Sequence, residues 1–256
     1  MRDVQSENDK RGLMINEVGI SDLYLPIFIS DKKNKKQQIV AKIKASVKLP
    51  SNQRGTHMSR FIEVIKNHQK FNFNNKKISK LMKEIRDKLH AECASLQLDF
   101  TYFINKKSPI SNKSFLMDYQ CKIKATISEN NTIKKELEVE VPISSVCPCS
   151  KIISKDGAHN QRGLVKINVN TSAFVWIETL INIAEISASG VLYPILKRED
   201  EKYVTEKMFA NPKFVEDIVR DIALQLKKDK KIESFEVECT NYESIHNHNA
   251  YAKIKS

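Results

Sequence analysis

The chain has 256 residues, of which 41% are hydrophobic and 29% are charged, so it can bury a sizeable core and is typical of a soluble globular protein. Its apolar runs fall far short of the roughly 20 residues that a membrane span needs, and its first residues lack the apolar segment of a secretory signal. The net charge of +12 favours a polyanionic partner, either a nucleic acid or a triphosphate, while five scattered cysteines favour the reducing cytoplasm over a disulfide framework.

The first half of the chain predicts two strands, two helices and two strands, in that order. Apolar and polar residues alternate along three stretches, which indicates strands with one buried face, and an earlier stretch is expected to pair with the first of them. Between the first two of these alternating stretches, apolar residues recur at helical spacing, which indicates helices. The expected strands cover residues 18–30, 39–49, 96–104 and 117–127, and the expected helices cover residues 57–68 and 78–89.

The second half repeats this ββααββ order, with a boundary near Asn130-Asn131. The expected strands cover residues 137–141, 164–169, 235–239 and 249–254, and the expected helices cover residues 171–189, ended by Gly190, and a stretch opening at Asn211-Pro212. The repeat predicts an α+β chain of two tandem units, residues 1–130 and 131–256, each an antiparallel sheet with helices on one face. Such sheets must cover their other face or close into a barrel.

Potential metal ligands are concentrated in two short segments of the second half. Cys147-Pro148-Cys149-Ser150 precedes a polar, glycine-bounded loop that contains His159, and residues 243–248 contain the other cluster. These segments hold three of the six histidines and two of the five cysteines. Thiols, imidazoles and carboxylates are the side chains that bind zinc in proteins, so the segments indicate one metal-dependent reaction centre. Of the two thiols, Cys149 is read as inert rather than as a ligand.

His246 and His248 are two residues apart, so in an extended segment they point to the same side. Such a pair either shares a metal or acts as a ligand and a proton donor, unless both lie in an exposed loop. Glu243 is expected either to bind the metal or to orient an imidazole.

The remaining charged motifs are less specific. The run Arg198-Glu199-Asp200-Glu201 has the composition of a solvated loop, while Glu216 adjoins the apolar stripe of a helix and is expected to be partly buried. A further motif contains Arg54, His57 and Arg60 and enters a helix, where it would either hold an anion at the helix N-terminus or simply cap the helix. We expect exposed side chains at two histidines in charged helices and buried thiols at three cysteines: His68, His90, Cys93, Cys121 and Cys239.

In this order, the motifs resemble those of the type IB GTP cyclohydrolase family. The matching segments span nearly the whole chain, and the longer ones are specific. They are Asp3-Val4-Gln5, Arg11-Gly12, residues 54–61, Cys147-Pro148-Cys149-Ser150, residues 157–163, Leu196-Lys197-Arg198, residues 211–217 and residues 243–248. The resemblance implies the tunnelling fold, built from ββααββ units, with the barrel completed in a homotetramer whose active sites lie at subunit interfaces.

The resemblance also implies the reaction, in which GTP and water give formate and 7,8-dihydroneopterin triphosphate, the first step toward tetrahydrofolate. It implies zinc or manganese, with iron as an alternative, no organic cofactor, and neither a nucleic acid nor a membrane as partner. The residue roles that it implies are metal binding by Cys147, His159 and Glu201 with Glu243 as a fourth or alternate ligand, catalysis by Cys147, His246 and His248, guanine binding by Glu216, and triphosphate binding by Arg54, His57, Arg60 and Arg162.

Three alternatives stay open at this point. An iron-dependent archaeal relative would release a cyclic phosphate product instead. A zinc-stabilised nucleic-acid-binding protein would fit the positive charge, but its structural zinc would be closed by four protein ligands. A tunnelling-fold reductase of a related purine would use a cysteine as nucleophile to form a thioimide, and its activity would not depend on a metal.

Overall fold

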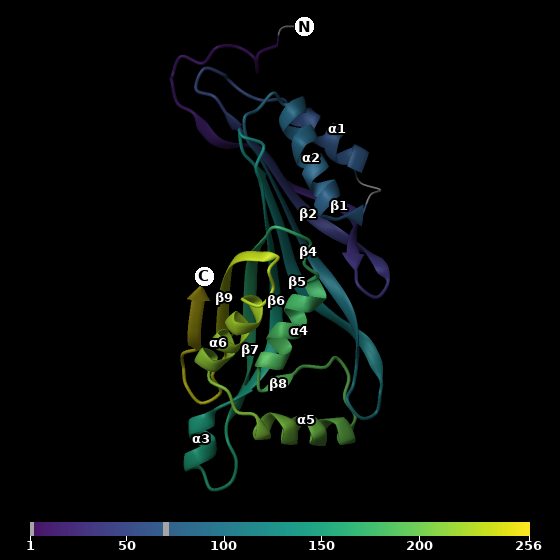
Figure 1. Cartoon of the computed structure of the whole chain (residues 1–256), viewed down its shortest axis with the longest axis vertical. Coiled ribbons are helices and arrows are strands. Elements are labelled where there is room, and N and C mark those ends of the chain that lie inside the picture. The colour runs from purple at the N-terminus through teal and green to yellow at the C-terminus, as the bar shows by residue number, and fades with distance from the viewer. Residues whose placement is uncertain (1–2, 69–71) are drawn as a thin grey trace. The chain divides into compact units, whose positions relative to one another are not determined.

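The first half of the chain forms the predicted ββααββ order. A computed structural model describes residues 3–68 and 72–256 (Figure 1). The elements of this half are β1 (Ile15–Asp31), β2 (Lys35–Leu49), α1 (Met58–His68), the short β3 (Asn72–Phe73), α2 (Asn75–Lys88), β4 (Ala94–Lys107) and β5 (Ser114–Ile127).

The second half repeats the order with additional short elements and one additional long helix. Its elements are β6 (Ile133–Val146), α3 (Pro148–Ile153), β7 (Asn160–Thr171), α4 (Ile177–Ser187), β8 (Gly190–Val191), α5 (Arg198–Ala210), α6 (Val215–Leu226), β9 (Ile232–Asn241) and β10 (Ala250–Lys255). Within the described residues, no helix is both long and apolar enough to cross a membrane.

The chain forms two compact units, and the strands β4, β5 and β6 contribute residues to both. The first unit comprises residues 1–100, 122–136 and 172–174, and the second comprises residues 101–121, 137–171 and 175–256. The sequence boundary at Asn130-Asn131 falls in the turn between β5 and β6. The division into two sequential repeats at this turn stays a prediction.

In the first unit, β2 lies between β1 and β4 in antiparallel pairing. Ile39 pairs with Ile27, and Ile43 pairs with Leu98, so the alternating apolar residues of neighbouring strands share one face. The helices α1 and α2 pack against each other on one face of this sheet (Figure 1). Their apolar side chains, including the fully buried Phe61, complete the core that the alternation predicts.

In the second unit, β9 lies between β7 and β10, again in antiparallel pairing. The helix α6 packs on β9 and β10 and against α4. The apolar stripe of α6 is buried against this sheet, and Ile218 and Ile222 of α6 have 0% exposure, as do Val237 and Cys239 of β9. This packing holds the first turn of α6, which carries Glu216, next to the end of β9, which precedes Glu243.

The expectation of a solvated loop at residues 198–201 was wrong, because these residues form the first turn of α5. Asp200 has no exposed surface and accepts hydrogen bonds from the backbone N–H groups of Lys197, Ile110 and Ser111 and from the Ser111 hydroxyl. Burial raises the pKa of Asp200, but these hydrogen bonds outweigh it and leave the pKa well below its usual value. Asp200 thus caps α5 and attaches its start to the turn after β4.

Four smaller expectations also differ from the structure. His68 was expected at the surface but is 3% exposed, with Nε2 lying 2.7 Å from Glu84 Oε2. Gly190 does not end the preceding helix, which stops at Ser187, but begins β8. The helix expected at Asn211-Pro212 begins at Val215, because the Asp217 carboxylate accepts the Phe214 N–H and so caps α6 there. Cys121 and Cys239 are buried as expected, whereas Cys93 is only partly buried.

Candidate functional site

A pocket of about 320 Å³ in the second unit gathers six of the side chains singled out in the sequence. It lies where the end of β6, the start of β7, the first turn of α6 and the segment between β9 and β10 meet. Its lining residues are Cys147, His159, Gln161, Lys213, Phe214, Val215, Glu216, Asn241, Glu243, His246, His248, Ala250 and Tyr251.

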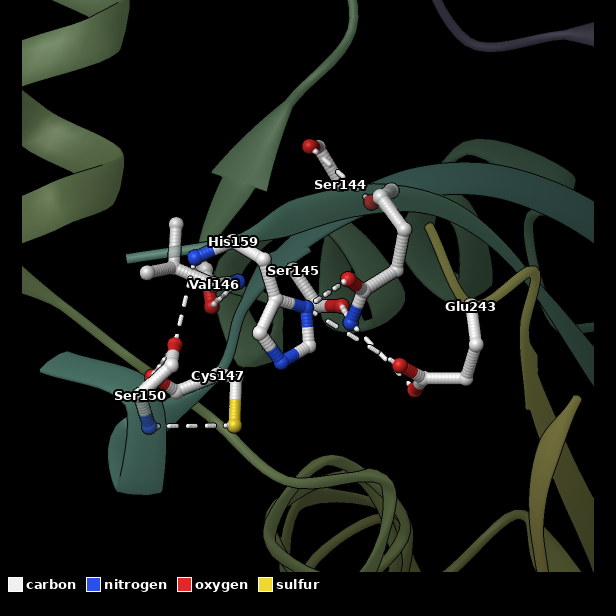
Figure 2. Close-up of polar contacts among 9 residues, drawn as sticks. Ser144, Ser145, Val146, Cys147, Ser150, His159 and Glu243 are labelled. Carbon is white, nitrogen blue, oxygen red and sulfur yellow. Dashed lines mark hydrogen bonds and ion pairs between the residues drawn. The ribbon is translucent and has the colours of Figure 1, made fainter. Parts of the chain in front are cut away.

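Cys147 is held at the turn between β6 and α3. Pro148 occupies the first position of α3, where a missing N–H costs nothing, and Cys147 is the N-cap residue. The Cys147 sulfur lies 3.5 Å from the Ser150 backbone N, which donates to it (Figure 2). The Cys147 backbone N–H also donates to the His159 carbonyl oxygen at 3.1 Å, so the backbone ties the thiol-bearing turn to the start of β7.

His159 is fixed at both its backbone and its ring. Its backbone N–H donates to the Ser150 hydroxyl at 3.1 Å. Its ring Nδ1 lies 2.9 Å from the Gln161 side-chain oxygen and 3.9 Å from Glu243 Oε2. In Figure 2 the ring lies between the Cys147 sulfur and the Glu243 carboxylate, with Nδ1 on the side of Glu243. The other ring nitrogen, Nε2, is therefore the one left available to a ligand.

The segment that carries Glu243 is brought to His159 by the pairing of β9 with β7. Gly163 pairs with Asn241, and the Tyr242 N–H donates to the Arg162 carbonyl at 2.9 Å. A Cβ atom at Gly163 would lie 2.5 Å from the Asn241 side-chain oxygen and 3.0 Å from the Thr240 carbonyl oxygen, so a larger residue would force a shift at this pairing. The side chain of Glu243 is 10% exposed, which places a carboxylate against a mostly buried imidazole.

His246 and His248 line the pocket from the segment between β9 and β10, which is not a strand in the structure. Their rings nevertheless stack with centroids 5.2 Å apart, so the two imidazoles lie on the same side, as their spacing indicates. Both residues are exposed. Both rings are therefore accessible to a molecule that enters the pocket.

Glu216 also lines the pocket, but the expectation that it is partly buried was wrong, because it is exposed in the first turn of α6. The buried residues of this turn are Val215 and Ile218, so Glu216 projects to the other side of the helix. Lys213 lines the pocket too, with its ammonium 2.7 Å from the Asp221 carboxylate.

The other predicted site residues do not line this pocket. Glu201 is an exposed residue of α5, and Arg162 is an exposed residue of β7. In the first unit, Arg54 Nη1 lies 2.8 Å from Glu7 Oε2, and the Arg60 guanidinium donates to the Lys88 carbonyl. His57 Nε2 lies 3.3 Å from Asp3 Oδ2. The triphosphate roles of these residues stay predictions.

The side chains of Cys147 and His159 are of the types that bind a metal ion, because a cysteine thiolate and an imidazole nitrogen are good zinc ligands. A catalytic zinc site usually has three protein ligands. Among the described residues, no group of three His, Cys, Asp or Glu side chains is close enough to hold a metal ion. Glu243 faces Nδ1 of His159, which favours an orienting role for its carboxylate over a ligand role.

Sequence reasoning missed Gln161, which links His159, Glu243 and the wall of the pocket. Its amide nitrogen lies 3.1 Å from the Ser145 hydroxyl and 3.4 Å from Glu243 Oε1. The sequence contained a signal for this contact, because residues i and i+2 of a strand point to the same face and Gln161 follows His159 by two residues.

The five thiols are predicted to differ strongly in reactivity. Burial raises the pKa of Cys239 to about 12 and raises the pKa of Cys121 further, so neither forms appreciable thiolate near neutral pH. Cys149 is exposed. We expect iodoacetamide at pH 8 to modify Cys149 first and to leave Cys121 and Cys239 unmodified, as peptide mass spectrometry would show. Denatured protein, the control, should be modified at all five, and early labelling of Cys239 in the native protein would contradict its burial.

The chain has the tunnelling fold. Solved structures of similar fold include uricase from Arthrobacter globiformis, with a TM-score of 0.52 and 8% identity over 94% of this chain and 92% of that chain. Urate oxidase from Bacillus subtilis 168 gives a TM-score of 0.52 and 9% identity over 94% and 98% of the two chains. At this identity the likeness concerns the fold alone, and it confirms the α+β fold expected from the repeat and the tunnelling fold implied by the family resemblance.

Sequence comparison gives the family. Residues 1–252 match the family described as type I GTP cyclohydrolase folE2. GTP cyclohydrolase FolE2 of Thermosipho africanus is 50% identical over 256 residues, covering 100% of this chain and 98% of the relative. The protein of the same name from Syntrophobacter fumaroxidans is 48% identical over 255 residues, covering 100% and 99%. The chain therefore belongs to the GTP cyclohydrolase FolE2 family, a family of hydrolases, which confirms the resemblance read from the motifs.

Proposed function

We propose that this chain is a metal-dependent GTP cyclohydrolase that converts GTP and water to formate and 7,8-dihydroneopterin triphosphate, the first step toward tetrahydrofolate. Family membership supports GTP cyclohydrolase activity. The observation that carries the metal-dependent form is the pairing of the Cys147 thiol with His159, whose Nδ1 faces Gln161 and whose Nε2 is left for a ligand.

Substrate binding in this proposal depends on Glu216. A carboxylate has two acceptor oxygens, and the edge of guanine presents two adjacent N–H donors, so the two groups match in geometry and charge. Glu216 is exposed and lines the same pocket as Cys147 and His159, so a guanine bound to it would place its five-membered ring inside the pocket. The triphosphate would be held by basic residues, for which Arg54, Arg60 and Arg162 stay candidates with His57.

Cys147 and His159 would hold zinc, manganese or iron, with Glu201 as the further ligand that the family resemblance implies. When bound, such an ion is a Lewis acid that lowers the pKa of a water ligand toward about 7. The carbon between the two nitrogens of the guanine five-membered ring is the atom that must be hydrated. The thiol and the imidazole would therefore have to face that carbon.

His246 and His248 would transfer the protons. Protonation of the adjacent ring nitrogen by one of these imidazoles makes the ring a better electron sink and makes that nitrogen a better leaving group. A second hydrolysis at the same carbon releases formate, and the opened ribose then supplies the carbons of the new ring. Stacking of the two imidazoles keeps both within one part of the pocket, so either can act without a rearrangement of the chain.

The same proposal includes a cytoplasmic homotetramer with active sites at subunit interfaces and no organic cofactor. The interface part of this proposal is supported by the ligand set of one chain, since among the described residues Glu201 does not line the pocket and no third ligand completes the pair. A ligand from a neighbouring subunit would complete the site.

The test is to incubate purified, metal-stripped protein with GTP, alone and with zinc, manganese or, without oxygen, iron added back. We expect formate and, after oxidation and dephosphorylation, fluorescent neopterin, only in the samples that received metal. A cyclic phosphate product would instead identify the iron-dependent alternative. No product with any metal would contradict the proposed function.

A further inference from the structure

The side chain of Gln161 occupies a position that decides which nitrogen of His159 carries a proton. Gln161 is 7% exposed and touches three polar side chains. Its oxygen lies 2.9 Å from His159 Nδ1, and its nitrogen lies 3.1 Å from the Ser145 hydroxyl and 3.4 Å from Glu243 Oε1. A neutral imidazole has one donor and one acceptor nitrogen, so the partner at Nδ1 determines whether Nε2 carries a proton or a lone pair.

The Glu243 carboxylate fixes which way the Gln161 amide points. An ionised carboxylate accepts hydrogen bonds and donates none, so the group of Gln161 that faces it must be the NH₂ group. The opposite orientation would place the amide oxygen against a carboxylate oxygen at 3.4 Å. With the NH₂ group committed to Glu243 and Ser145, the amide oxygen faces His159, and it can only accept.

We infer that Gln161 is a positioning residue that holds His159 in the Nδ1–H tautomer, with Glu243 and Ser145 orienting the Gln161 amide. His159 Nδ1–H then donates to the Gln161 oxygen, and the Nε2 lone pair faces the open part of the pocket. The Glu243 carboxylate, 3.9 Å from Nδ1, favours the same proton position. The consequence for metal binding rests on the proposed function, whereas the tautomer itself is a property of the metal-free chain.

This arrangement gives Glu243 a defined role without making it a ligand. A carboxylate that binds Nδ1–H through an amide makes the imidazole a better electron donor at Nε2. The hydrogen bond between Gln161 and His159 Nδ1 also keeps the imidazole ring from rotating, since rotation would break this 2.9 Å contact. Loss of such orienting partners commonly weakens metal binding by about 10- to 100-fold.

The test compares variants that remove only one contact each. Gln161→Met has a similar shape but offers no acceptor to Nδ1. Ser145→Ala is a milder variant, because it removes one of the two partners of the Gln161 NH₂ group. Ser144→Ala is the matched control, because the neighbouring Ser144 hydroxyl donates to the backbone carbonyl of Gln161 and not to its side chain. In Figure 2, Ser144 and Ser145 lie on the same strand.

The direct readout is solid-state NMR of metal-free protein labelled with ¹⁵N-histidine, with the His159 signals identified by their loss in His159→Gln. We expect wild type and Ser144→Ala to show a protonated Nδ1 and an unprotonated Nε2. Gln161→Met should populate the Nε2–H form, and Ser145→Ala should do so to a smaller extent. An Nε2–H form in wild type, or an unchanged tautomer in both Gln161→Met and Ser145→Ala, would overturn the inference.

Zinc affinity, measured by competition with a chromophoric chelator, provides the second readout. Gln161→Met should bind about 10- to 100-fold more weakly than wild type, and Ser144→Ala should bind equally. Equal affinity of Gln161→Met and wild type would refute the role of the tautomer in metal binding. If wild type shows the Nδ1–H tautomer and binds zinc but never converts GTP, the proposed function fails while this inference stands.

Discussion

Replacement of Cys147 by serine is expected to remove bound metal and GTP turnover together. A thiolate is a much stronger ligand for zinc than a hydroxyl, so we expect a loss of metal affinity larger than the roughly 100-fold that an orienting partner can cause. Serine retains an acceptor for the Ser150 N–H that the sulfur now receives at 3.5 Å, so α3 keeps its N-cap. Metal content by atomic spectrometry and neopterin formation measure the two losses.

Cys149→Ser is the matched control for this prediction. Cys149 lies two residues away in the same turn, is exposed and does not line the pocket, so this variant should keep metal and turnover near the wild-type values. Cys147→Ala also removes the side-chain acceptor that caps α3. A lower unfolding temperature of Cys147→Ala than of Cys147→Ser would therefore report the loss of this cap. Full metal content with normal turnover in Cys147→Ser would remove Cys147 from the ligand set.

The strands were predictable because a half-buried strand imposes a period of two on its sequence. In β2, the buried residues Ile39, Ala41 and Ile43 alternate with exposed ones, and this pattern appears in the sequence without any knowledge of the partner strands. The helix α5 lacks such a pattern, since Asp200 is its one buried residue and its hydrogen bonds come from Lys197 and the distant residues Ile110 and Ser111. A long-range contact of this kind leaves no local signal.

The residues of the candidate site also differ in how far the sequence alone could predict their roles. Cys147, His159 and Glu243 could be selected from the sequence because few side chains bind metals and these lie in short, polar motifs. The role of Gln161 could not, because it depends on side-chain contacts between β6, β7 and the segment after β9. Glu216 was found but its burial was misjudged, because the capping contact of Asp217 starts α6 at Val215 and leaves Glu216 on the exposed side of the first turn.

Glu216→Gln is expected to weaken GTP binding while metal content stays unchanged. The glutamine amide has one acceptor oxygen, so its NH₂ group would face one of the two guanine N–H donors and leave it unpaired. Losing a hydrogen bond to a charged group costs about 1.5–3 kcal/mol, which corresponds to roughly a 10- to 150-fold rise in Kd. Calorimetric titration of GTP into metal-free protein measures this change without catalysis.

Two controls separate guanine recognition from a general effect of removing a charge. Glu233→Gln removes an exposed glutamate at the start of β9 that does not line the pocket, so it should leave GTP binding unchanged. Inosine triphosphate lacks the exocyclic amino group of guanine, so wild type should bind it more weakly than GTP. Glu216→Gln should discriminate between the two nucleotides much less, because the carboxylate that contacts the amino group is gone. Unchanged affinity for GTP, or undiminished discrimination, would show that another group recognises the guanine edge.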